Sequence, residues 1–92
     1  MSEGSLSCWV YRSTRVQEMY LYLVEEDGFD PVPPALLARF GEPILVIELE
    51  LSSERELARE DVNEVMANLR GRGFHLQIPP QLQPQLYHGN LD

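Results

Sequence analysis

The sequence contains no lysine and no apolar run long enough to cross a membrane. Without lysine, the chain cannot form a Schiff base with a carbonyl substrate, and it cannot supply the lysine of a P-loop. Its longest apolar runs, Met19–Val24 and Ile44–Ile47, are far shorter than the roughly 20 residues that a transmembrane helix needs. These absences exclude two common classes of catalytic site and predict no association with a membrane.

A single cysteine, Cys8, is present, so an internal disulfide cannot form. This usage fits a reducing compartment. The first residues, Met1–Ser5, carry neither a basic region nor a long apolar stretch, and therefore do not resemble a signal peptide. We expect a cytoplasmic protein in which Cys8, inside a strand-like run and without a neighbouring base, is a small buried side chain rather than a catalytic thiol.

Positive charge is also scarce. The chain has seven arginines and fifteen acidic residues, and its net charge is −8. Proteins bind phosphate backbones through clustered positive charge, so DNA is excluded as a partner and RNA is disfavoured. The chain has no Cys-x-x-Cys, His-x-x-x-His or Gly-x-Ser-x-Gly pattern. We therefore predict no catalytic, cofactor-binding or metal-ligating residues, and no cofactor.

The residues that are present predict one folded domain. A length of 92 residues, with 43% hydrophobic and 24% charged residues, is typical of a small globular chain. Two-residue alternation and β-branched or aromatic runs predict four strands, at residues 7–12, 18–25, 43–51 and 74–78. Helical spacing and stop signals predict three helices, at residues 35–40, 53–59 and 61–71.

The last two helices are predicted from capping patterns. Ser53 with Glu56 matches a capping box, and Asp61 with Glu64 is an acidic variant of the same signal. A single continuous helix over 53–71 is the alternative. Either Gly71 or Gly73 ends the second helix, and the element order is then β-β-α-β-α-α-β.

This order predicts an α/β (α+β) sandwich with a four-stranded mixed sheet. The central strand is apolar on both faces, which indicates that it is covered on both sides. The connection through the first helix is long enough for a crossover between parallel strands. The third strand is expected to start buried at Ile44–Ile47 and to turn Glu48 and Glu50 to water. The domain is predicted to span 7–80, with flexible termini at 1–6 and 81–92.

Aromatic residues give the one candidate binding surface. If the first two strands pair in a simple register, Trp9, Tyr11, Tyr20 and Tyr22 share a face of the sheet, with Arg12 close to it. Such a face can stack the bases of single-stranded RNA or bind a protein partner. Burial in the core is the simpler interpretation, because three predicted helices are available to cover the sheet.

The remaining polar residues offer one weaker hypothesis, an enzyme with an unfamiliar site built from Glu48, His75 or Arg12. Paired carboxylates at Glu48 and Glu50 are more simply solvated charges on a strand. A lone histidine in a strand, as at His75, is more often structural than catalytic.

Several short segments resemble the YcgL-domain family of bacterial proteins. They are Tyr11–Ser13, Met19–Leu23, Phe29, Val32–Pro33, Leu37, Phe40–Gly41, Pro43, Leu57–Ala58, Asp61, Gly73–Phe74, Leu76–Gln77 and Pro79–Pro80. The similarity runs from about Cys8 to Pro80 with intact spacing. The resemblance implies a compact single-domain α/β sandwich, and it supplies neither an activity nor catalytic residues.

These observations favour a small, non-catalytic, cytoplasmic module that binds an unidentified protein partner. The first alternative is an accessory factor in RNA metabolism that associates with RNA or with a ribonuclease. The second alternative is an enzyme with an unrecognised site.

Overall fold

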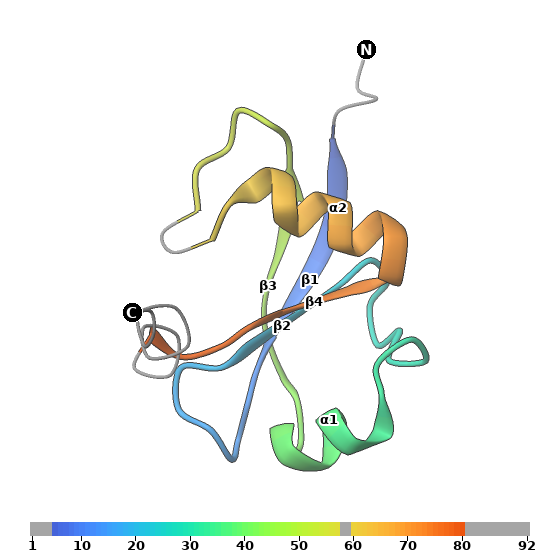
Figure 1. The fold of residues 1–92 in the computed structure, drawn as a ribbon, viewed down its shortest axis with the longest axis vertical. Coiled ribbons are helices and arrows are strands. Elements are labelled where there is room, and N and C mark those ends of the chain that lie inside the picture. Colours follow the sequence, from blue (N-terminus) through green and yellow to red (C-terminus); the bar gives the residue numbers. More distant parts are fainter. Residues whose placement is uncertain (1–4, 58–59, 81–92) are drawn as a thin grey trace, which may run out of the picture.

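The computed structural model describes residues 5–57 and 60–80 (Figure 1). Their elements, in chain order, are β1 (Leu6–Arg12), β2 (Tyr20–Leu23), α1 (Pro34–Phe40), β3 (Ile44–Leu51), α2 (Val62–Arg72) and β4 (Phe74–Gln77). The four predicted strands are confirmed to within a few residues. The first strand begins at Leu6, one residue before the predicted start of the domain. The predicted flexible tail, 81–92, lies outside the described residues.

The strands form one sheet in the order β3-β1-β2-β4, and every neighbouring pair is antiparallel. The predicted mixed sheet is therefore wrong. The strands β2 and β3 do run in the same direction, as the crossover through α1 predicts, but β1 lies between them. The connection leaves β2 and carries the chain past β1 to its far side, so no parallel pair forms.

The described residues contain two helices instead of the three predicted. Residues 53 and 54 form a turn, in which the Arg55 N–H donates to the Ser52 carbonyl at 3.0 Å, and 55–57 are irregular. The last two residues of the predicted helix lie outside the described residues. Leu57 is the one large apolar side chain in this segment, and a short helix without an apolar face to bury is marginal in water. The turn at the start of this segment also excludes a continuous helix over 53–71.

The predicted start of α2 at Asp61 is confirmed, and of the two candidate stops, Gly71 and Gly73, the helix uses Gly73. Asp61 precedes the helix, and its side chain accepts a hydrogen bond from the Asn63 N–H at 2.9 Å, which satisfies one free donor of the first turn. Gly73 ends the helix with φ of 88°, the left-handed conformation that favours glycine, and its N–H donates to the Leu69 carbonyl.

Both faces of the sheet are covered, as the central strand predicts. Figure 1 shows α2 lying across the strands, while α1 lies at the opposite end of the molecule. The core under α2 contains Cys8, Val10, Tyr22, Leu51, Val62, Val65, Met66 and Leu69. The core on the other face contains Tyr11, Met19, Leu21, Leu23, Val32 and Phe40. The sheet therefore separates two small cores, and β2 contributes to both.

The burial of β3 is the reverse of the prediction. Ile44–Ile47 are exposed by 39–50%, whereas Leu51 at the other end of the strand is fully buried. In the described chain β3 has one neighbour, β1, and Leu51 packs in the core under α2. The apolar residues at the start of β3 lie outside the area that α2 covers. Glu48 and Glu50 are exposed, as expected.

The hairpin loop between β1 and β2 is fixed against the end of α1 by Ser13. Its hydroxyl donates to the Phe40 carbonyl at 2.5 Å and accepts from the N–H groups of Arg15 and Val16 at 3.0 and 2.8 Å. One buried side chain thus shapes the turn and satisfies a carbonyl that the helix leaves unpaired.

Two more side chains of the loop bind the same region. The Thr14 hydroxyl donates to the Glu42 carbonyl at 3.0 Å, and Arg15 Nη1 donates to the Ala38 carbonyl at 3.2 Å. This close approach explains the glycine after α1. Gly41 has φ of 80°, and a Cβ there would overlap the side chains of both Arg15 and Thr14.

We therefore expect Gly41→Ala to lower the free energy of unfolding by about 1–3 kcal/mol, because the substitution adds strain at positive φ and separates the loop from α1. Urea denaturation followed by circular dichroism measures the change. Gly71→Ala is the matched control, since a Cβ there meets nothing within 4 Å. In the exposed face of α2 it should stabilise by about 0.5–1 kcal/mol. Equal stability of Gly41→Ala and the parent chain would contradict this account.

A second prediction concerns Cys8, which is fully buried in the core under α2. Burial raises the pKa of its thiol from 9.0 to about 11. The folded state then holds this proton more tightly than the unfolded chain, so the corresponding stability is present below pH 9 and is lost as the pH rises toward 11. Between pH 8 and pH 10 we expect a decline of about 1 kcal/mol in urea denaturation. The decline should be smaller in Cys8→Ala by about 1 kcal/mol, and an unchanged decline in that variant would assign it to other groups.

Candidate functional site

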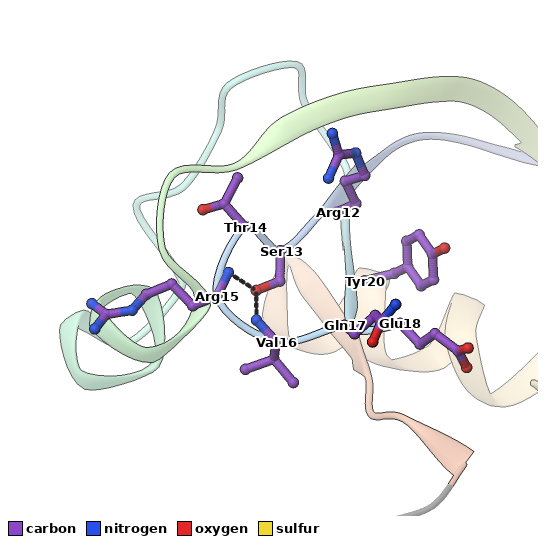
Figure 2. A pocket seen from close by; sticks show the side chains of 8 residues that line it. All are labelled: Arg12, Ser13, Thr14, Arg15, Val16, Gln17, Glu18 and Tyr20. Atoms are coloured by element: carbon purple, nitrogen blue, oxygen red, sulfur yellow. Dashed lines mark hydrogen bonds between the residues drawn. The ribbon is translucent and has the colours of Figure 1, made fainter.

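One cavity of the described chain lies at the hairpin loop. It has a volume of about 550 Å³ and is lined by Arg12, Ser13, Thr14, Arg15, Val16, Gln17, Glu18 and Tyr20. Figure 2 shows the guanidinium groups of Arg12 and Arg15 on opposite sides of the loop, with Glu18 and Tyr20 directed away from both. The charged groups do not converge on one point where a substrate atom could be bound.

The polar groups nearest the centre of this loop are already used by the fold. The Ser13 hydroxyl donates its proton to the Phe40 carbonyl, and no histidine lines the cavity to act as its base. A serine nucleophile needs such a base within hydrogen-bond reach. The loop therefore has a structural role, and Arg12 is its exposed member from the predicted binding surface.

The predicted aromatic face is divided by the observed register. Val10 pairs with Tyr22, and Arg12 pairs with Tyr20. Residues opposite one another share a face, so Tyr20 and Tyr22 lie on the α2 side and Trp9 and Tyr11 on the other. The prediction of a shared face is wrong, because an offset of one residue in pairing exchanges the faces of a whole strand.

Tyr11 is a core residue with a satisfied hydroxyl. It is 3% exposed, it donates to Asp27 Oδ1 at 3.1 Å, and it accepts from the Asp27 N–H at 2.7 Å. Its ring meets the edge of Phe29 at a centroid distance of 5.0 Å. Burial raises the pKa of the Tyr11 hydroxyl. These contacts hold Asp27 at φ of 61° and attach the turn after β2 to the sheet.

Tyr22 is equally buried, at 6% exposure, on the other face. Its hydroxyl donates to Gln77 Oε1 at 2.8 Å, and its ring meets His75 at 5.5 Å in an edge-to-face arrangement. Of the predicted surface, Trp9 and Tyr20 are therefore left half-buried, and Arg12 is exposed.

His75 is structural in the same sense. Asn68 Nδ2 lies 2.9 Å from Nδ1, and Glu60 Oε1 lies 2.7 Å from Nε2. The amide donates to Nδ1, so Nε2 carries the proton that the Glu60 carboxylate accepts. This chain of hydrogen bonds connects β4 with α2 and with the segment that precedes it.

The hypothetical catalytic groups are dispersed. Glu48 lies on β3 and His75 on β4, which are the two outer strands of the sheet, while Arg12 lies at the hairpin. No single cleft joins them among the described residues. That part of the chain also contains no group of three or more His, Cys, Asp or Glu placed to hold a metal ion, and none of its helices has the length and apolarity of a membrane span.

The surface that sequence reasoning missed is the start of β3. We call Ile44, Leu45, Val46 and Ile47 the β3 patch; their exposed fractions are 39%, 45%, 50% and 48%. An apolar run is usually interpreted as a buried strand. Only the order of the strands in the sheet shows that β3 lies at its edge. The adjacent Glu48-Leu49-Glu50 alternation is typical of a half-exposed strand. It is the sequence signal that indicated exposure of β3.

A smaller cavity adjoins the β3 patch on the α2 side of the sheet. This Tyr20 cavity has a volume of about 220 Å³ and is lined by Val10, Tyr20, Tyr22, Ile47, Leu49, Leu57 and Gln77. Ile47 belongs to both the cavity and the patch. The walls of the cavity come from all four strands, so no local sequence pattern could have predicted the cavity.

Comparison with known proteins places the chain in a family. The model of the YcgL domain matches residues 8–80. A YcgL domain-containing protein of Stutzerimonas stutzeri is 48% identical over 83 residues, which cover 90% of this chain and 86% of the relative. One from Pseudomonas syringae pv. tomato is 47% identical over 81 residues, covering 88% and 84%. Their names give the domain and no activity. The chain belongs to the YcgL-domain family.

Proposed function

We propose that this domain is a non-catalytic, cytoplasmic protein-interaction module, and that it binds an extended segment of a partner protein along the outer edge of β3. The observation that carries the proposal is the exposure of the β3 patch, four consecutive large apolar residues at 39–50%. Burial of these side chains against a partner would remove apolar surface from water, at roughly 25 cal/mol for each Å².

The position of the patch suggests the manner of binding. Edge strands offer unpaired N–H and C=O groups, and proteins commonly protect them with charge, proline or bulges. Ile44–Ile47 contain no charged residue and no proline, and the one such device in the segment is the register shift against β1 that leaves Val46 without an opposite residue. An exposed apolar edge of this kind suits the addition of one more strand, in which backbone hydrogen bonds give affinity and alternate side chains give specificity.

Charge indicates the chemistry of the partner. Exposed Glu42 lies just before the patch, exposed Glu48 and Glu50 lie just after it, and the whole chain carries −8. A segment with apolar residues flanked by arginine or lysine complements this arrangement and is steered toward it. We therefore assign the edge to a basic, apolar segment of another protein.

A second copy of the chain fits the edge less well. Two antiparallel β3 strands related by a two-fold axis at Leu45 would pair Glu42 with Glu48. An axis at Val46 would pair Glu42 with Glu50. Like charges directly opposite one another destabilise a strand pair.

The alternatives from the sequence gain no support. Binding of single-stranded RNA was predicted from a shared aromatic face, whereas Tyr11 and Tyr22 are buried and lie on opposite faces. The hypothetical enzyme site from Glu48, His75 and Arg12 is dispersed over three parts of the fold.

Panning of a display library of unstructured twelve-residue peptides against the immobilised domain tests the proposal. We expect enrichment of alternating apolar peptides with basic flanks. Val46→Lys should weaken their binding at least about tenfold, because it removes apolar contact and repels the flanks. Ala67→Lys makes the same change of charge on the exposed face of α2 and should leave the affinity unaltered.

Equal binding by Val46→Lys and Ala67→Lys would overturn the proposal, as would the absence of any enriched peptide. Sedimentation of the domain alone provides the remaining test. A dimer that Val46→Lys dissociates would assign the edge to a second copy instead of a partner protein.

A further inference from the structure

The Tyr20 cavity lies beside the proposed docking edge and on a defined face of the sheet. Val10 pairs with Ile47 on one side and with Tyr22 on the other, so these three side chains project to the same α2-side face. Ile47 is 48% exposed and forms the outer rim, whereas Val10 and Tyr22, each 6% exposed, form the floor.

The polar groups of this cavity are largely satisfied within the fold. The Tyr22 hydroxyl donates to Gln77 Oε1 at 2.8 Å, so these two oxygen atoms are already hydrogen-bonded to each other. The other walls are the side chains of Val10, Ile47, Leu49 and Leu57 and the half-buried ring of Tyr20. Such walls favour an apolar group over an ion or a sugar.

We infer that the Tyr20 cavity receives one aromatic side chain of the partner segment that binds along β3. This inference rests on the proposed function and names the anchor of that same interface. A strand added at the edge would run about 4.8 Å from β3, with alternate side chains on the α2-side face next to Ile47. A ring on that strand reaches across Ile47 into the cavity.

The size of the cavity fits this occupant. An apolar cavity of about 150 Å³ in a protein core is large enough to bind benzene. The Tyr20 cavity, at about 220 Å³, therefore has room for the ring of phenylalanine or tryptophan. An aromatic anchor inserted into a desolvated pocket is the usual form of an interface hot spot, surrounded by contacts that exclude water.

The first arm of the test uses indole as a probe of the domain alone. In a heteronuclear NMR titration we expect saturable shifts at millimolar indole, concentrated on the methyl groups of Val10 and Ile47 and on the Tyr20 ring. Ile47→Trp fills the rim and should weaken indole binding at least about tenfold. Ala67→Trp is the matched control, because Ala67 is exposed on α2, does not line the cavity and does not belong to the β3 patch.

The second arm uses a peptide enriched by the wild-type domain. Alanine substitution along the peptide should identify one aromatic position whose loss weakens binding about tenfold on the wild type and on Ala67→Trp. The same substitution should cause no further loss on Ile47→Trp, where the cavity is already filled.

The outcomes separate the two claims. An alanine scan with no dominant aromatic position, together with weakening by Val46→Lys, would overturn the anchor and leave strand docking intact. Indole shifts elsewhere on the domain, or shifts unchanged by Ile47→Trp, would also overturn the anchor. Indole binding in the cavity without any enriched peptide would overturn the docking proposal and this inference with it.

Discussion

The antiparallel register between β1 and β2 is the constraint on which the rest of the structure depends. Pairing of Val10 with Tyr22 directs these two side chains into the core under α2, while Tyr11 and Leu21 enter the core on the other face. Because a strand alternates its side chains, this choice assigns every residue of both strands at once. It leaves β3 and β4 as the outer strands, and it turns Tyr11 and Tyr22 into structural residues with hydrogen-bonded hydroxyls.

Local features of the fold could be predicted from the sequence, whereas pairwise features could not. Strand positions, the Asp61 cap and the Gly73 stop follow from short patterns that need no partner. The burial of Ile44–Ile47 depended on which strand lies next to β3, and the shared aromatic face depended on register. The helix predicted at 53–59 had a capping pattern but little apolar surface to bury, so tertiary packing gave it no support over 53–57.

Several residues in the segments that resemble the family have structural roles in this fold. Ser13 and Gly41 fix the hairpin loop against the end of α1, and Tyr11 attaches the turn that contains Asp27. The resemblance therefore describes how this family folds. The β3 patch and the Tyr20 cavity differ in kind, because they expose apolar surface that none of the described elements covers, and such surface is a common mark of an interaction site.

The central claim is that β3 is a docking edge, and amide hydrogen exchange tests it most directly. The exchange of each backbone N–H would be measured in the free domain and with an enriched peptide bound at saturation. A strand added at this edge forms hydrogen bonds with the outward-facing amides of β3. The account therefore predicts slower exchange at alternate residues of β3, with the alternation interrupted at Val46, where the register against β1 shifts. Protection confined to β4 or to α2, or no new protection along β3, would contradict it.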